Sequence, residues 1–178
     1  MFRKLNVEEI IRLSVDEFQK VEKLPVTIIL DNVRSLHNVG SVFRTADACC
    51  LEEIFLCGIT ATPPSAEIHK SALGAEFSMK WQYFEDAKEA ILKLKENNYR
   101  ILSVEQTQNS IMLNDYKVSE NQKYALIFGN EVHGVQQNLI DLCDHCIEIP
   151  QFGTKHSLNV SVAAGIVVWE FWKGFNKS

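Results

Sequence analysis

The sequence predicts a single α/β domain in which helices cover both faces of a mostly parallel β-sheet. Short apolar runs rich in β-branched residues alternate along the chain with segments of helical spacing, and this alternation is typical of a parallel sheet with crossover helices. The 178 residues, 46% of them hydrophobic, suffice for one full core and leave little room for a second domain. No repeat or long linker divides the chain.

The first segment, residues 2–23, has apolar residues at helical spacing and ends at Leu24-Pro25. This pattern predicts an amphipathic helical extension over residues 1–24, packed on the domain or at a subunit interface, and places the domain itself at 25–178. The residues of its apolar side are Leu5, Ile10, Leu13, Phe18 and Val21.

Within the domain, apolar runs predict strands at 26–30, 54–57, 81–84, 101–104, 125–128 and 146–149. The run at 26–30 is continuous, as expected for a strand that is buried on both faces. Helical spacing predicts a helix from near Asn38, a short one around 71–74, and one from its cap Asp86 to the Asn97-Asn98 pair. Further helices are expected at 135–142 and 157–171.

Charge and cysteine content narrow the function classes. A net charge of −5 argues against a broad basic surface for nucleic acid, so any RNA contact must come from local basic groups. Candidates are Arg34, Arg44, Lys70 and Lys155. Five cysteines do not form a secreted disulfide framework. Cys143 and Cys146 have a metal-like spacing but no second pair, so we expect reduced thiols and no metal site.

Neither end of the sequence predicts a membrane segment. The N-terminal residues include Glu8, Glu9 and Asp16 and lack the apolar core of a signal peptide. Ser161 and Glu170 interrupt the apolar start of the C-terminal helix, which is therefore too short and too polar to span a bilayer. We expect a cytoplasmic protein.

Three junctions between a strand and the following helix, at 31–44, 128–134 and 149–165, are unusually polar. Ligands of open α/β sheets bind outside the carboxyl ends of the strands, so these junctions are the candidate site. In the first junction, Arg44 follows Asn38 by six residues, which places it one turn into the helix, where its fork can bind a phosphate. Alternatively, Arg44 is an ordinary surface residue and Gly40 only permits close helix packing.

At the second junction, Gly129 permits a backbone turn or close approach by a ligand. Glu131 either serves the site or merely interacts favourably with a helix N-terminus. At the third junction, Ser157 and Asn159 are placed to cap the closing helix, so the loop can direct N–H groups at a ligand. No G-x-G-x-x-G, P-loop or G-x-S-x-G sequence is present, which disfavours a Rossmann dinucleotide site and a hydrolase elbow.

In this order, the three junctions resemble the motifs of the SpoU-type (TrmH-like) RNA 2′-O-ribose methyltransferases, a branch of the SPOUT superfamily. The resemblance covers about residues 25–172, and the matching segments are Asn38-x-Gly40-x-x-x-Arg44, Phe128-Gly129-Asn130-Glu131, and Ile149-Pro150 through Ser157-Leu158-Asn159. It departs from the family at Val132, where Gly is common, and at Gln151, where Met is frequent.

The resemblance implies a deep C-terminal trefoil knot, which binds S-adenosylmethionine, and a homodimer with the site at its interface. Carried onto this sequence, it implies cofactor contacts from Val104, Glu105, Gly129, Ile149, Ser157 and Leu158. Catalytic roles would fall to Asn38, Arg44, Glu131, Ser157 and Asn159. Asn38 would position the ribose or phosphate, and the family proposal makes Arg44 the proton acceptor. Because guanidinium stays protonated in proteins, a phosphate held by Arg44 is the alternative acceptor.

The implied function is S-adenosylmethionine-dependent methylation of a ribose 2′-hydroxyl in tRNA or rRNA, with tRNA favoured and no DNA or membrane partner expected. One alternative is a non-catalytic RNA-binding or assembly protein on the same knotted scaffold. Another is an unrelated α/β nucleotide-binding enzyme, which would bind NAD or ATP instead of S-adenosylmethionine.

Overall fold

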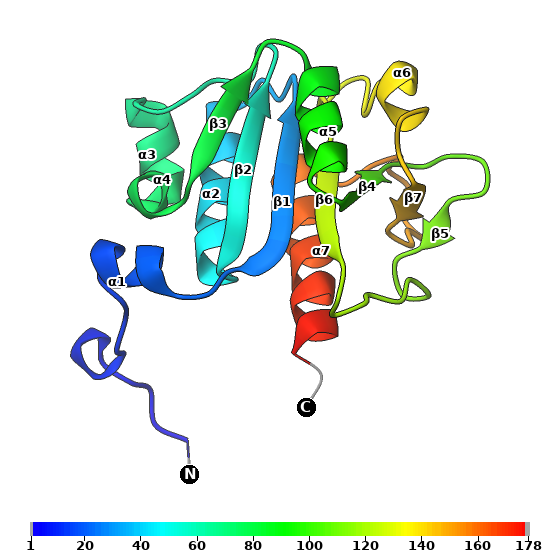
Figure 1. Cartoon of the computed structure of the whole chain (residues 1–178). Helices are drawn as coiled ribbons and strands as arrows, with labels where there is room; N and C mark the ends of the chain where they lie inside the picture. The colour runs from blue at the N-terminus through cyan, green and yellow to red at the C-terminus, as the bar shows by residue number, and fades with distance from the viewer. Residues whose placement is uncertain (1, 177–178) are drawn as a thin grey trace.

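The computed structural model describes residues 2–176 and contains a seven-stranded sheet in the order β3-β2-β1-β6-β4-β7-β5. Within residues 2–176, all pairings between its strands are parallel, so the predicted parallel α/β sheet is confirmed (Figure 1). The strands are β1 (Leu24–Asp31), β2 (Leu51–Cys57), β3 (Trp81–Phe84), β4 (Tyr99–Val104), β5 (Ile111–Met112), β6 (Lys123–Phe128) and β7 (His145–Glu148). The trefoil knot stays a prediction.

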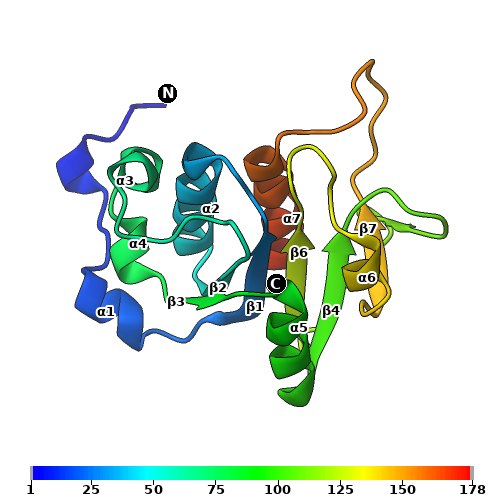
Figure 2. The same cartoon turned by 90° about the horizontal axis from the view of Figure 1, so that it is seen from above.

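Helices cover both faces of this sheet, as predicted. Figure 2 shows α2, α3, α4 and α7 on one face and α5 and α6 on the other. The helices are α1 (Val15–Lys20), α2 (Leu36–Ala48), α3 (Ala66–Ala72), α4 (Ala75–Ser78), α5 (Ala87–Glu96), α6 (Gln137–Ile140) and α7 (Val160–Phe175). A short 3-10 helix, Val7–Glu9, precedes α1.

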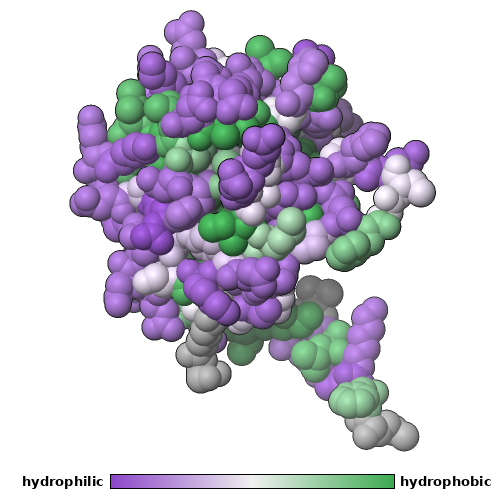
Figure 3. Space-filling model, turned by 90° about the vertical axis from the view of Figure 1, so that its right-hand side faces the viewer, coloured by the Kyte–Doolittle hydropathy of each residue, from purple (hydrophilic) through white to green (hydrophobic). Residues whose placement is uncertain are grey.

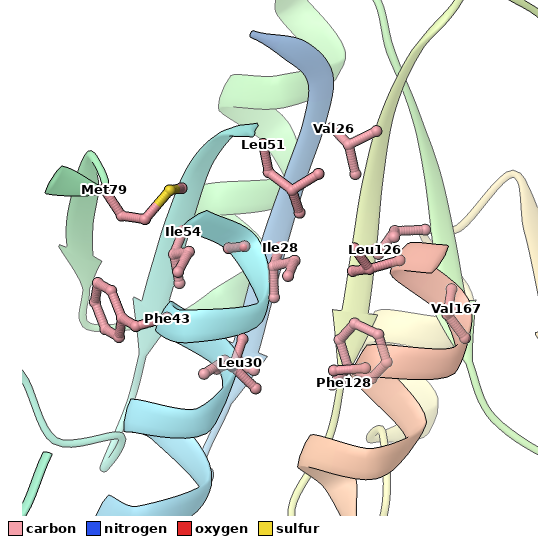
Figure 4. Packing of buried hydrophobic residues seen from close by; sticks show 14 of the residues in the cluster. Val26, Ile28, Leu30, Phe43, Leu51, Ile54, Met79, Leu126, Phe128 and Val167 are labelled. Carbon is pink, nitrogen blue, oxygen red and sulfur yellow. The ribbon is translucent and has the colours of Figure 1, made fainter. Parts of the chain in front are cut away.

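The core therefore has two parts, one on each face of the sheet. On the larger side, Phe43 of α2 lies against the strands, and Leu126 and Phe128 of β6 point toward Val167 of α7 (Figure 4). Gly40 lets α2 approach α3 closely, because a Cβ there would fall 2.2 Å from the Ser71 Oγ. The predicted packing role of Gly40 is thus confirmed.

The N-terminal segment is less helical than its periodicity predicts. Ser14 caps a new helix through a capping box with Glu17, so α1 covers only Val15–Lys20. Phe18 is buried in the larger core cluster and holds α1 on the body. The side chains of Ile11 and Leu13 are exposed, and they provide no packing that would extend the helix toward the N-terminus. The segment before α1 extends away from the sheet (Figure 1).

Several predicted boundaries shift for identifiable reasons. Helix α2 starts at Leu36 because the Ser35 side chain accepts the Asn38 N–H. Helix α7 starts at Val160 because the Asn159 side chain caps it, so Ser157 lies in the loop and does not cap the helix. Helix α6 is shorter than the predicted 135–142. Strand β5 was not predicted, because two residues are too few to show a period.

Candidate active site

A cavity of about 550 Å³ lies beyond the carboxyl ends of β4, β6 and β7. This is the place where the sequence predicted a site. Residues from three segments line the cavity: 104–106, 128–134, and parts of 148–163 that leave out 152–155. All six residues predicted to bind the cofactor line it, namely Val104, Glu105, Gly129, Ile149, Ser157 and Leu158. A volume of this size is typical of pockets for small molecules and cofactors.

In the second segment, two parts of the backbone lie so close together that glycine is required. Asn130 and Gly134 form an antiparallel β-bridge, which brings the backbone of Gly134 against Gly129. A Cβ on Gly129 would fall 2.1 Å from the Gly134 carbonyl carbon, a separation that real structures do not tolerate. Gly134 itself has a φ of 65°, in the region that favours glycine. Gly129 therefore permits a close approach by the protein's own backbone at Gly134.

Glu105 holds two lining segments together. Its carboxylate accepts the Val135 N–H at 2.9 Å and the Gln106 N–H at 2.8 Å. The Glu105 Oε2 also occupies the space beside Gly134, where a Cβ would lie 2.0 Å from it. Glu105 thus shapes the cavity by fixing the loop after β6 to the loop after β4.

Asn130 fixes the other side of the same loop. Its Oδ1 accepts the Val132 N–H at 2.8 Å, and its Nδ2 donates to the Asn32 carbonyl at 2.8 Å. The sequence alone predicted no role for Asn130 beyond its place in the motif. Its position directly after a strand and a glycine, in a turn, is the signal that points to such an Asx contact.

Glu131, Asn38 and Asn159 form a continuous hydrogen-bond chain between the three junctions. The Asn159 Oδ1 accepts the Ser161 N–H at 2.9 Å, and its Nδ2 donates to the Asn38 Oδ1 at 3.1 Å. The Asn38 Nδ2 in turn donates to the Glu131 Oε1 at 3.1 Å. Asn38 is buried, whereas Glu131 and Asn159 are exposed at the cavity rim. The chain therefore connects the N-terminus of α7 with the carboxylate of Glu131.

Glu131 accepts two further hydrogen bonds from the first junction. The Arg34 N–H donates to its Oε2 at 3.0 Å and the Ser35 N–H to its Oε1 at 3.1 Å. Partial burial opposes ionisation of Glu131, but these N–H donors and the Asn38 amide prevail and hold its pKa below the ordinary value. Since its described donors all favour the ionised form, Glu131 is built to stay charged and to fix the loop at 34–35.

Two of the predicted catalytic residues lie outside this hydrogen-bond chain. Ser157 lines the cavity and is exposed. Arg44 is exposed on α2 and does not line the cavity, and its guanidinium has no hydrogen-bond or ion-pair partner among residues 2–176. Its fork is therefore available to a partner outside the described chain.

The cavity also contains residues that the sequence analysis missed or treated as ordinary loop positions. Gln106, Glu148 and His156 line it, and His133, considered a loop histidine, lies on the same wall. The Gln106 Nε2 donates to the His156 carbonyl at 2.6 Å and so connects the loops after β4 and β7. These residues lie far apart in sequence, and only the strand order β6-β4-β7 brings them together.

Cys143 and Cys146 do not contribute to a metal site in the described part of the chain. Within residues 2–176, no group of three or more His, Cys, Asp or Glu side chains is arranged to hold a metal ion. Burial raises the pKa of the Cys143 thiol to about 12, and its Sγ lies 3.2 Å from the Leu139 carbonyl oxygen. Over the same residues, no helix is long and apolar enough to cross a membrane.

Comparison with known proteins decides the family. The model of the SpoU rRNA Methylase family matches residues 25–169. The chain belongs to this family. The predicted resemblance is therefore confirmed. The second and third polar junctions line one cavity, and a hydrogen bond from Asn38 to Glu131 joins the first junction to them.

Named SpoU relatives include enzymes of both rRNA and tRNA. The chain is 29% identical over 155 residues to a 23S rRNA (guanosine-2′-O-)-methyltransferase, RlmB, of Neisseria meningitidis, and covers 61% of it with 87% of its own length. It is 31% identical over 146 residues to a tRNA (guanosine(18)-2′-O)-methyltransferase of Aquifex aeolicus, covering 66% of that protein with 80% of its own length. The chain thus spans about three fifths of the length of the RlmB relative.

Solved SpoU structures share the fold. The A. aeolicus TrmH/SpoU tRNA modifying enzyme aligns with a TM-score of 0.79 at 22% identity, over 90% of this chain and 80% of that one. An AdoMet-bound rRNA methyltransferase from Sinorhizobium meliloti aligns with a TM-score of 0.78 at 25% identity, over 90% of this chain and 61% of that one.

Proposed function

We propose that this SpoU family member is an S-adenosylmethionine-dependent RNA methyltransferase that modifies a ribose 2′-hydroxyl of tRNA or rRNA. The observation that carries the proposal is the hydrogen-bond chain from Asn159 through Asn38 to Glu131, at the rim of the cavity. It unites three motifs that are far apart in sequence. The names of the N. meningitidis and A. aeolicus relatives support the reaction type. Between the two, tRNA is favoured, since the tRNA enzyme matches at the higher identity and over more of its length.

The lining of the cavity fits S-adenosylmethionine. Val104, Ile149 and Leu158 offer apolar surface for the adenine, and the backbone beside Gly129 and Ser157 offers polar groups for its edge and for the ribose. When bound, S-adenosylmethionine supplies an electrophilic methyl group on a sulfonium sulfur. Two enzymes with this fold support the assignment: the S. meliloti rRNA methyltransferase, whose structure contains bound AdoMet, and the A. aeolicus tRNA modifying enzyme.

The residues around the cavity orient the acceptor and manage its proton. A ribose hydroxyl is a weak nucleophile until it is aligned and its proton has an acceptor. Glu131 is a poor acceptor because three N–H donors already stabilise its ionised form. Arg44 stays protonated and binds a phosphate of the RNA, and a phosphate oxygen then takes the proton. The reaction requires a 2′-hydroxyl, so RNA and not DNA is the substrate.

The position of Arg44 supports a homodimer, the state that the family resemblance implies. Arg44 does not line the cavity of its own chain, whereas a second copy can offer it another cavity. Mixing Arg44→Ala with Glu131→Gln subunits tests this arrangement. If Arg44 serves the partner's cavity, mixed dimers contain one intact site and activity returns. If it serves its own cavity, every site in the mixture is defective and activity stays absent.

The first experiment measures methyl transfer from labelled S-adenosylmethionine to total RNA of a strain that lacks this gene. The RNA is separated into tRNA and rRNA fractions, and the Arg44→Ala and Arg44→Lys variants are assayed in parallel. Label in one fraction, resistant to alkaline cleavage at one nucleotide and lost in Arg44→Ala, supports the proposal and names the substrate class. Binding of S-adenosylmethionine without label in either fraction favours the non-catalytic RNA-binding alternative.

A further inference from the structure

The loop between β7 and α7, residues 149–159, presents an aromatic side chain to solvent beside the cavity. Phe152 is 98% exposed, more than any other large apolar residue between residues 15 and 176. Figure 2 shows this loop projecting from the body. Figure 3 views the molecule from another side, where a projection at the right carries apolar residues beside hydrophilic ones. Single exposed apolar residues are common on proteins, so the position of Phe152 decides its meaning.

That position is at the rim of the cavity, and both ends of the loop hold it there. Ile149 and Gln151 on one side, and His156 to Asn159 on the other, line the cavity, whereas 152–155 do not. The hydrogen bond from Gln106 to the His156 carbonyl fixes the second half of the loop. Asn159 fixes the end of the loop by capping α7. The Phe152 ring therefore lies outside the cavity, in the same loop as residues that line it.

The chemistry of the loop suits a nucleic acid. Residues 149–159 contain Lys155 and His156 and no acidic residue, in a chain whose net charge is −5. An aromatic face beside a cation is the combination with which proteins hold unpaired bases, because every base has a π-face and each nucleotide carries a negative charge. At Gly153, a Cβ would meet no atom within 4 Å, so the space beside the Phe152 backbone is open.

We propose that Phe152 is the stacking platform for an unpaired nucleobase of the RNA, adjacent to the nucleotide whose ribose enters the cavity. This inference deepens the proposed function and rests on it. Phe152 is a specificity-determining residue here, since it selects RNA segments whose bases are unstacked and free to leave a helix. Double-stranded RNA hides its base faces and is excluded by the same contact.

Binding of the small-RNA fraction from a strain lacking this gene tests the proposal. Affinity is measured by filter binding with S-adenosylhomocysteine present, for the wild type, Phe152→Ala, Phe152→Tyr and the control Phe77→Ala. Phe77 of α4 is also an exposed phenylalanine, at 63%, but it does not line the cavity. Phe152→Ala is expected to weaken RNA binding by about 5- to 150-fold, the range that stacking on one base spans. Phe152→Tyr and Phe77→Ala should bind like the wild type.

Binding of S-adenosylmethionine and the oligomeric state are measured on the same variants. Unchanged values for Phe152→Ala show that its defect lies in RNA contact. The proposal is overturned if Phe152→Ala binds RNA as the wild type does, if the wild type binds none, or if the variant changes oligomeric state, which would make the ring an interface residue. A wild type that binds RNA through Phe152 but transfers no methyl group would refute the proposed function and leave the stacking role standing.

Discussion

Replacing Glu131 with Gln tests whether the carboxylate fixes the first junction. Glu131 accepts hydrogen bonds from the Arg34 N–H, the Ser35 N–H and the Asn38 amide, over distances of 3.0 to 3.1 Å. Glutamine keeps only one acceptor oxygen. In its better orientation, that oxygen still faces Ser35 and Asn38, but the new NH₂ group opposes the Arg34 N–H. One bond is lost, and the two others change from charge-assisted to neutral.

The expected loss of stability follows from these bonds. A hydrogen bond to a charged group contributes roughly 1.5–3 kcal/mol and a neutral one roughly 0.5–1.5 kcal/mol, with the lower values applying at exposed sites. Because Glu131 is exposed, the three changes together amount to about 2 kcal/mol. For a domain of this size, that lowers the melting temperature by about 4–8 °C.

Thermal unfolding at several pH values measures this effect. A group whose pKa is lowered by folding stabilises the protein above its unfolded pKa, about 4.3 for Glu, and the stabilisation disappears as pH falls through the folded pKa. The pKa of Glu131 is lowered, so the wild type and Glu131→Gln should differ at pH 7 and converge below about pH 4. The control is Glu120→Gln, at a carboxylate that is exposed on the surface. Equal melting temperatures at pH 7 would refute the fixing role.

Three further substitutions test neighbouring parts of the structure. Gly40→Ala places a Cβ 2.2 Å from the Ser71 Oγ and should lower the free energy of unfolding by about 1–3 kcal/mol, as overpacking does. Urea unfolding measures this loss, and Gly165→Ala is the control because a Cβ at Gly165 meets no atom within 4 Å. Asn159→Ala removes the cap of α7 and should cost about 1 kcal/mol in the same assay while also weakening S-adenosylmethionine binding. Burial opposes ionisation of Glu76, but its bond to His69 at 2.5 Å helps keep its pKa low. Glu76→Gln should therefore lower the melting temperature at pH 7, and its difference from the wild type should disappear below about pH 4; a difference that persists at that pH would contradict this.

The sequence predicted the sheet well because most of its strands are buried on both faces. Residues 26–30 and 125–128 are fully apolar or β-branched, and both lie within central strands of the sheet. The sequence did not predict β5, and it predicted a longer α6, because short elements show no period. It overestimated helix before residue 15 because spacing alone does not supply a surface on which to pack.

The sequence named candidate site residues but not the contacts between them. Motif resemblance selected Glu131 and Asn159, and the structure brings both to Asn38, across 93 and 121 positions of sequence. Local pattern carries no information on such pairings, because they depend on the order of the strands. The bonds of Glu105 to the loop after β6 were missed for the same reason.

The hydrogen-bond chain has only one consistent direction. The N–H groups at the start of α7 are donors, so Asn159 must turn its oxygen toward them and its NH₂ toward Asn38. The oxygen of Asn38 then faces Asn159, and its NH₂ faces Glu131. Glu131 must therefore accept, and it does so best as a carboxylate. The positive end of α7 thus sets the orientation of two amides and favours the charge of Glu131. Glu131 is therefore the fixed end of this chain, and under the proposed function the proton passes to a group that arrives with the substrate.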